Sequence, residues 1–243
     1  MTHEAMVRAE GVSVRYNRNL VVDHVSFEVA RGSVYALLGR NGAGKSSIIR
    51  CLLGLQKPTS GRVMIQGFDV WTDRARVLSR VAYVPETCDA PGQLRVSDVA
   101  SFQESMYPAW DRDAVRDRLK RFGVSPAATI SALSKGQKAL FSLALALGSR
   151  PDLLVLDDPT LGLDVVARND FFSDFIGDLA DRGTTVILTT HDLAGVEGIA
   201  DRVGILQGAH LAIDADVETL RSDRGQSLEQ VFTEVTAGSG RAS

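Results

Sequence analysis

The chain has 243 residues, of which 44% are hydrophobic, so it can bury one large core or a core with an inserted subdomain. Its formal net charge of −3 argues against a dedicated nucleic-acid binder, because such proteins carry a basic excess. The N-terminal stretch MTHEAMVRAE lacks the apolar run of a secretory signal. Apolar runs such as ALFSLALALG fall short of the ~18 to 20 residues that cross a bilayer. We therefore expect a soluble, cytosolic polypeptide with no nucleic acid among its partners.

The first part of the chain is dominated by β-patterned segments. Strands are predicted over residues 7–16, 25–30, 33–39, 62–67 and 80–86. The third of these segments runs directly into a glycine-rich turn, and the apolar residues that follow it have helical spacing over 45–55. The sequence therefore predicts a strand, a loop and a helix in immediate succession.

The character of the chain changes between about Gly92 and Gly148, where helices dominate. The helices predicted in this block cover residues 96–107, 111–123 and 134–148. After the block, the sequence predicts strands at 153–157, 184–190 and 203–207 that alternate with helices at 165–183 and 192–201. Because this alternation implies a parallel sheet covered on both faces, we expect an α/β fold with an inserted helical subdomain.

The stretch GRNGAGKS fits the phosphate-binding pattern G-x-x-x-x-G-K-[ST]. It stands after a predicted strand and opens a predicted helix, which is the context that confirms the pattern; a merely flexible glycine turn is the alternative. Its glycines let backbone N–H groups turn toward phosphate oxygens, while Lys45 adds charge and the helix N-terminus adds its dipole. The predicted nucleotide-binding loop consists of Gly39, Arg40, Asn41, Gly42, Ala43, Gly44, Lys45, Ser46 and Ser47.

Two adjacent acids follow the strand predicted at 153–157, in the stretch LVLDDPTLGLD. Acids at the tip of a buried strand are costly unless negative charge is needed there, although a strand end turned out to solvent is an ordinary alternative. The phosphate loop supplies such a need, because Ser46 would ligate Mg²⁺ and Asp157 would hold that ion through its water shell. Asp158 would then face the position of an attacking water.

The stretch ALSKGQ, at residues 132–137, opens the last helix of the helical block. Ser134 and the N–H groups near Gly136 would form a second anion site at a helix N-terminus, although a plain serine N-cap is the commoner use of such a pair. The stretch resembles the LSGGQ signature of ATP-binding cassette (ABC) ATPases. Its position between the phosphate loop and the carboxylate strand favours the functional interpretation.

The resemblance to ABC ATPases extends over nearly the whole chain. Tyr16 stands where the family's aromatic residue stacks on adenine, and Glu86 in YVPE stands in the region of its Q-loop. Asp164 in LGLD matches the D-loop, and His191 in TTHD matches the switch histidine. A strand-end tyrosine and a solvated histidine are the plain alternatives, but His191 follows a predicted parallel strand at its C-terminal end, where ligand sites gather.

The resemblance implies a P-loop NTPase (RecA-like) core with a parallel sheet, an N-terminal antiparallel β-subdomain and the inserted helical subdomain. On this interpretation residues 1–235 form a single ABC ATPase domain. Its nucleotide-binding core with the β-subdomain covers 1–91 and 149–235, and its helical subdomain covers 92–148. Residues 236–243 are expected to be a disordered tail.

The resemblance also implies a mechanism in which two such domains close over two ATP molecules with Mg²⁺. The pair would be a homodimer, or a heterodimer with another ABC ATPase subunit. Each ATP would be held by the phosphate loop of one subunit and by the signature residues of the other, which are Ser134, Lys135, Gly136 and Gln137. Hydrolysis would use a water polarised by Asp158, while His191 steadies the γ-phosphate and Lys45 absorbs charge.

The same resemblance implies membrane partners. Because the chain has no membrane span of its own, opening and closing of the pair would drive separate transmembrane permease subunits. The chain would then be cytoplasmic and peripheral on the inner face of the cell membrane. Contact with the permease would fall near Glu86 and on the helical block.

Three residues depart from the family pattern. Asp158 stands where most members have Glu, and the missing methylene withdraws the carboxylate by roughly 1 Å, which can cost on the order of 100-fold in rate. Glu86 replaces a neutral glutamine, and Lys135 replaces the first glycine of LSGGQ, so the two changes are opposite in sign and we expect them to compensate. We favour a working ATPase, and an ATP-gated dimer clamp with weak hydrolysis is the alternative that Asp158 keeps open.

These variants together resemble short ATPase subunits of bacterial ABC-2 type exporters, including those associated with drug efflux. The C-terminal SLEQVFTEVT is similar to the LEDVF ending common in that group, and locally Ser227 would cap a short helix that buries Leu228, Val231 and Phe232. A soluble ABC ATPase, for example of the iron–sulfur assembly type, is a further alternative. The cargo is not encoded in these residues, because specificity belongs to the membrane partner.

Overall fold

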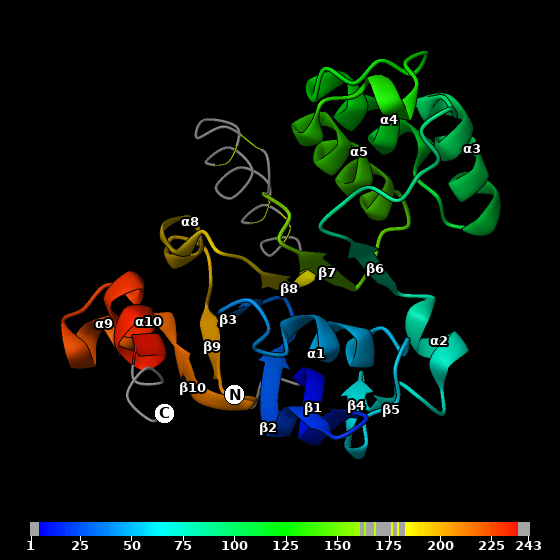
Figure 1. Cartoon of the computed structure of the whole chain (residues 1–243). Coiled ribbons are helices and arrows are strands. Elements are labelled where there is room, and N and C mark those ends of the chain that lie inside the picture. The colour runs from blue at the N-terminus through cyan, green and yellow to red at the C-terminus, as the bar shows by residue number, and fades with distance from the viewer. Residues whose placement is uncertain are drawn as a thin grey trace.

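The computed structural model covers the whole chain and describes residues 5–160, 163, 168, 176, 179 and 183–237 (Figure 1). Within these residues the chain forms two sheets, a group of helices that stands apart from both sheets, and a C-terminal helical segment. None of the described helices is long and apolar enough to cross a membrane.

The first sheet is antiparallel and has the strand order β2-β1-β4-β5. Its strands are β1 (Ala5–Tyr16), β2 (Asn19–Ala30), β4 (Ser60–Ile65) and β5 (Phe68–Asp69). Alternating burial along β2 turns one face of this sheet toward the core. A Cβ on Gly61 would lie 2.2 Å from the carbonyl oxygen of Gly11, so only glycine fits where β4 passes β1. The N-terminal antiparallel β-subdomain is therefore confirmed.

The second sheet holds the parallel core and has the order β10-β9-β3-β8-β7-β6. Its strands are β3 (Val34–Gly39), β6 (Val81–Val84), β7 (Leu153–Asp157), β8 (Thr185–Thr189), β9 (Arg202–Gln207) and β10 (His210–Asp216). All neighbours are parallel except β10, which pairs antiparallel with β9 at the edge. Every residue of β3 and β8 is buried, as expected for strands covered on both faces.

Helix α1 (Lys45–Leu52) lies between the two sheets (Figure 1). Its buried residues Ile48, Ile49 and Leu52 join side chains of β1, β2, β3 and β7 in one core cluster. A second cluster covers the other face of the parallel sheet and takes in α8 (Leu193–Glu197) and α10 (Leu228–Ala237). The predicted α/β core with a covered parallel sheet is therefore confirmed.

The helical subdomain consists of α3 (Val96–Met106), α4 (Arg112–Arg121) and α5 (Lys135–Gly148) and has a core cluster of its own. Asp111 begins α4 by accepting a hydrogen bond from the N–H of Ala114 at 2.9 Å. The short 3-10 helix η1 (Ile130–Ala132) leads into α5. These elements fall within the predicted helical block.

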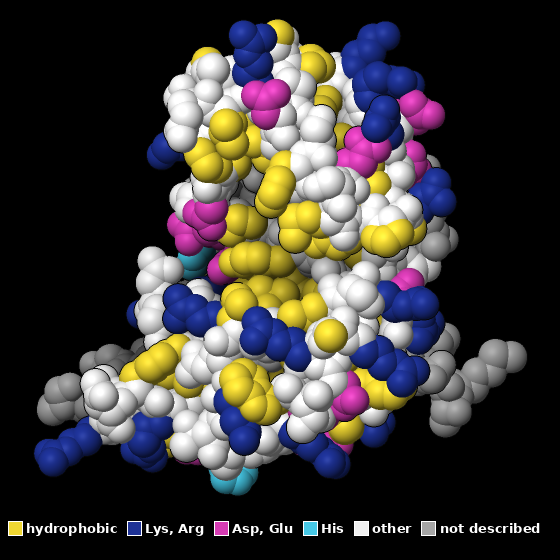
Figure 2. Space-filling model, turned by 90° about the vertical axis from the view of Figure 1, so that its right-hand side faces the viewer, with side chains coloured by type: hydrophobic (Ala, Val, Ile, Leu, Met, Phe, Trp, Pro, Cys, Tyr) yellow, Lys and Arg dark blue, Asp and Glu magenta, His cyan; other side chains and the backbone are white. Residues whose placement is uncertain are grey.

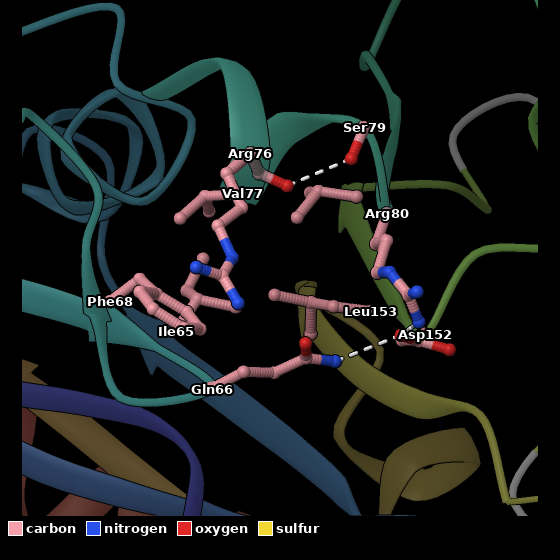
Figure 3. Close-up of a pocket in the computed structure, with 10 residues that line it drawn as sticks. Ile65, Gln66, Phe68, Arg76, Val77, Ser79, Arg80, Asp152 and Leu153 are labelled. Carbon is pink, nitrogen blue, oxygen red and sulfur yellow. Dashed lines mark hydrogen bonds and ion pairs between the residues drawn. The ribbon is translucent and has the colours of Figure 1, made fainter. Parts of the chain in front are cut away.

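A pocket of about 410 Å³ lies where the β4–β5 hairpin, the short helix α2 (Arg74–Leu78) and the start of β7 meet (Figure 3). At its edge Asp152 accepts hydrogen bonds from Gln66 Nε2 at 2.8 Å and from Arg80 Nη1 at 3.0 Å. The guanidinium of Arg76 lies over the ring of Phe68, with Cζ 3.6 Å from the ring centroid. These contacts tie the antiparallel sheet to the parallel core.

The sequence did not predict five of the described elements, which are β5, α2, η1, β10 and α9 (Val217–Arg224). Helix α2 is only 5 residues long, too short to show a helical period, and β10 is a half-exposed edge strand without a run of buried residues. Helix α10 runs to Ala237, so the first two residues of the segment expected to be a tail are helical. Residues 238–243, and nearly all of the helix predicted at 165–183, lie outside the described residues.

Candidate active site

The loop between β3 and α1 has a backbone conformation that only its glycines allow. Gly42 and Gly44 have φ angles of 82° and 103°, in the region that favours glycine. A Cβ on Gly44 would lie 2.6 Å from the carbonyl oxygen of Val21, so no other residue fits there. Gly44 is also the N-cap of α1 and provides no side-chain cap. The first turn of α1 is thus open to an anion, which would accept hydrogen bonds from its N–H groups.

Lys45 is buried beneath this loop, with 9% of its surface exposed. Its Nζ donates hydrogen bonds to the carbonyl oxygens of Gly39 at 2.6 Å and Arg40 at 3.3 Å. Burial lowers the pKa of Lys45, while the nearby charges of Asp158 and Asp157 oppose that shift. The loop therefore holds a largely desolvated ammonium group directly opposite the two acids.

The adjacent acids lie at the carboxyl end of β7, beside the end of β8. Asp157 Oδ1 accepts a hydrogen bond from Thr189 Oγ1 at 2.6 Å. Asp158 has a φ of 44°, and its carboxylate oxygen Oδ2 lies 3.7 Å from Nε2 of His191. Burial is the main cause that raises the pKa of Asp158, with Glu86 and Asp157 adding to it and His191 and Lys45 opposing it. A half-buried carboxylate beside an imidazole can accept a proton from water.

These groups line one pocket of about 260 Å³. The predicted site residues among its lining are Asn41, Gly42, Ala43, Gly44, Lys45, Ser46, Ser47, Glu86, Asp157, Asp158 and His191. The sequence did not predict the other lining residues, which are Val21, Thr189 and Thr190. The position of Thr189 at the end of a predicted strand beside the acid-bearing strand is the signal that could have found it.

Tyr16 lies next to the pocket but is not among its lining residues. Its hydroxyl is 3.5 Å from Ser47 Oγ and accepts a hydrogen bond from Arg50 Nη1 at 3.3 Å. The hydrogen bond with Ser47 is the main cause that lowers the pKa of Tyr16. The side chain is 40% exposed, so its ring is accessible to solvent, and stacking on adenine stays a prediction.

The signature residues do not line this pocket. Ser134 is the N-cap of α5: its Oγ accepts a hydrogen bond from the N–H of Gln137, and the Gln137 Oε1 accepts one from the N–H of Ser134, both at 3.1 Å. This is a complete capping box, so the alternative use of the serine as a cap is observed. Lys135, the first residue of the helix, is exposed, and Gly136 follows it. Asp164 lies outside the described residues.

The chemistry of the residues that line the pocket fits a magnesium ion bound together with phosphates. Among the described residues no cluster of three or more His, Cys, Asp or Glu side chains forms a metal cage. Mg²⁺ bound with substrate phosphates takes only one or two protein carboxylates and keeps several waters. The oxygen-bearing side chains that line the pocket and could serve it are those of Ser46, Glu86 and Asp157.

The chain is similar to known proteins over most of its length. A family model described as ABC transporter matches residues 22–161. The Nod factor export ATP-binding protein I of Paraburkholderia xenovorans (strain LB400) is 34% identical over 236 residues, which cover 94% of this chain and 77% of the relative. The linearmycin resistance ATP-binding protein LnrL of Bacillus subtilis (strain 168) is 30% identical over 232 residues, which cover 93% of this chain and 74% of the relative.

A solved structure described as the ATP binding subunit of an ABC transporter has the same fold. It superimposes with a TM-score of 0.86 at 27% identity, over 95% of this chain and 99% of that chain. The family model covers the strand β3, the phosphate loop, the helical subdomain and both acids. The chain therefore belongs to the ABC transporter family.

Proposed function

We propose that this chain hydrolyses ATP as the motor subunit of a bacterial ABC exporter and drives separate membrane subunits. The observation that carries the proposal is the pocket that brings Lys45, Asp157, Asp158 and His191 to the open N-terminus of α1. A desolvated ammonium and free helix N–H groups suit a triphosphate, and a carboxylate beside an imidazole suits an attacking water. Export is supported by the names of the two relatives, a Nod factor export protein and a linearmycin resistance protein.

Each group in the pocket then has a role. Lys45 and the N–H groups at the start of α1 bind the phosphates. Ser46, Asp157 and Glu86 would hold Mg²⁺, which would neutralise charge on the phosphates. Asp158 orients the water and takes up its proton, and His191 contacts the γ-phosphate. Because Lys45 is buried and both acids are partly buried, their charges act on a bound phosphoryl group more strongly than they would in water.

The functional unit is a pair of such domains, either two copies of this chain or this chain with another ABC ATPase subunit. Ser134 and Lys135 are exposed at the start of α5 and do not line the pocket of their own chain. A helix N-terminus with an added lysine is suited to bind the phosphate of an ATP held by another subunit. Closure of the pair over ATP then supplies the movement that the membrane subunits use.

A large apolar groove is the docking site that we assign to the membrane subunit. Figure 2 shows hydrophobic side chains gathered in the hollow between the core and the helical subdomain, and the groove has a volume of about 750 Å³. Core residues such as Tyr83 and Pro85 line one side, and Phe102 of α3, which is 65% exposed, lines the other. A short amphipathic helix of a permease fits such a groove and would hold the chain against the inner face of the membrane.

Steady-state hydrolysis of Mg-ATP by the purified chain tests the motor role. We expect Lys45→Ala to lose ATP binding and Asp158→Asn to retain it while turnover falls by about 100-fold or more. Lys120→Ala removes an exposed lysine of α4 and is the matched control. Full turnover in Asp158→Asn would overturn the role of Asp158. A silent parent that Asp158→Glu activates would instead identify an ATP-gated clamp.

The groove is tested separately, by co-purification with membranes. Phe102→Asp should reduce membrane association in cells that express the permease while leaving hydrolysis by the isolated chain within about twofold, because the residue is remote from the phosphate loop. Unchanged association would contradict the assignment. A chain that never associates with membranes would point to a soluble ABC ATPase.

A further inference from the structure

Thr189 is a buried polar residue at the active site to which the proposed hydrolysis assigns no role. It ends β8, is 1% exposed and pairs in register with Asp157 across the parallel ladder. Its hydroxyl oxygen lies 2.6 Å from Asp157 Oδ1 and 3.2 Å from the backbone nitrogen of Asp158. A single side chain therefore contacts both of the adjacent acids.

The direction of these hydrogen bonds follows from the number of protons. The N–H of Asp158 can only donate, so Thr189 Oγ1 accepts from it, and the carbonyl oxygen of Thr189 accepts from the same N–H at 3.0 Å. A threonine hydroxyl has only one proton, and this proton is donated to Asp157 Oδ1. The carboxylate of Asp157 is thus fixed in one orientation by a charge-assisted hydrogen bond.

From this geometry we propose that Thr189 is a positioning residue for hydrolysis. It fixes the orientation of the Asp157 carboxylate, which would hold Mg²⁺, and it fixes the backbone that carries the short side chain of Asp158. The inference rests on the proposed function, because it assigns roles to both acids. Positioning by Thr189 matters more with aspartate at position 158 than it would with glutamate, because a shorter side chain has less freedom to correct a misplaced backbone.

If Thr189 had only a structural role, removing its hydroxyl would have the same effect as removing another buried threonine hydroxyl nearby. Thr185 begins β8, is fully buried, and its Oγ1 accepts a hydrogen bond from the N–H of Gly32 at 2.9 Å. Thr190 Oγ1 accepts one from the N–H of Asp192 at 3.0 Å. Neither of these hydrogen bonds involves the acids, so Thr185 is a matched control for removal of a buried threonine hydroxyl from β8.

The test compares Thr189→Val, Thr189→Ser and Thr185→Val with the parent chain. The first variant keeps the shape and loses the hydroxyl, and the second keeps the hydroxyl. ATP binding is measured by fluorescence titration with Mg²⁺ and with a chelator, followed by kcat, KM and the melting temperature. Binding is the primary readout, because it does not depend on turnover.

In the parent chain, Mg²⁺ should increase the affinity for ATP. In Thr189→Val this increase should be smaller by about 10-fold or more, and the affinity measured in chelator should be unchanged. Its kcat should fall by about 10- to 100-fold because the acids are misplaced, and its KM for Mg-ATP should rise with the loss of affinity. Thr189→Ser should stay within about threefold of the parent in both readouts. Thr185→Val should lower the melting temperature alone.

Three results would overturn the proposal: a Thr189→Val protein with the parent's Mg²⁺ response and kcat, a Thr189→Ser protein as impaired as Thr189→Val, or a Thr185→Val protein with the same losses. A parent that binds ATP in a Mg²⁺-dependent way without hydrolysing it would overturn the motor function. In that case the binding titration still decides the role of Thr189.

Discussion

Each end of strand β7 carries a partly buried acid, and the surroundings of the two acids shift their pKa values in opposite directions. Burial opposes the charge of Asp152 just before the strand, yet hydrogen bonds from Gln66 and Arg80 overcome it and lower the pKa (Figure 3). Just after the strand, burial raises the pKa of Asp158, and the nearby acids Glu86 and Asp157 add to the effect. A carboxylate whose charge is stabilised by hydrogen bonds contributes to the stability of the fold. A carboxylate whose charge is poorly stabilised is better suited to accept a proton during a reaction.

The largest effect that this comparison predicts is on catalysis. Asp158→Asn should lower kcat by about 100-fold or more and should not lower the melting temperature, because the substitution removes a charge that burial disfavours. Parallel measurements of turnover and thermal unfolding check both parts. A large loss of stability in this variant would show that Asp158 is structural, like the acid at the other end of the strand.

The matching substitution at the other end of β7 should affect stability and leave catalysis unchanged. Asp152→Asn weakens the hydrogen bonds with Gln66 and Arg80, so the free energy of unfolding in urea should fall by about 1 kcal/mol, with kcat within twofold of the parent. Asp117→Asn, at an exposed acid of α4, is the control.

The stability difference at Asp152 also has a definite pH dependence. Because its pKa is lowered on folding, the charge stabilises the native state above the unfolded-state pKa of about 3.9, and this contribution is lost as the pH falls through the lower native value. The parent and Asp152→Asn should therefore converge in unfolding free energy in acid. A difference that persists there would assign the effect to packing instead.

A smaller effect is expected in the pH profile of hydrolysis. Asp158 must be ionised to accept a proton, and its raised pKa means that the base form is lost as the pH falls through a value above that of an ordinary aspartate. The acidic limb of kcat/KM should therefore lie at a higher pH than the pKa of an ordinary aspartate. Removal of the imidazole in His191→Ala should move that limb further up, since His191 opposes the shift. A limb that does not move would exclude Asp158 as its origin.

The sequence predicts the phosphate end of the molecule well because local chemistry determines it. The glycine pattern requires its own backbone angles, and Lys45 follows it on a helix with regular apolar spacing. The covered parallel sheet follows from apolar runs such as that of β7. These features need no knowledge of distant contacts.

What the sequence leaves out depends on contacts between distant segments. Thr189 reaches Asp157 only because β7 and β8 are parallel neighbours in that register, which the residue pattern does not specify. The edge strand β10 forms because it pairs with β9, and its own residue pattern does not specify that pairing. The role that we propose for the signature residues requires a second subunit, and the single chain shows only the helix cap made by Ser134.

The smallest effect concerns the contact between Arg76 and Phe68 in the pocket beside Asp152. A guanidinium over an aromatic ring at a partly exposed site contributes about 0.5–1 kcal/mol, so Arg76→Met should lower the free energy of unfolding by that amount. Phe68→Leu removes the ring, and in that background Arg76→Met should cost almost nothing. This double-mutant cycle measures the interaction between Arg76 and Phe68. An equal loss of unfolding free energy on Arg76→Met in the parent and in Phe68→Leu would contradict a contact with the ring. Neither substitution should change kcat, because neither residue lines the pocket that holds Lys45 and Asp158.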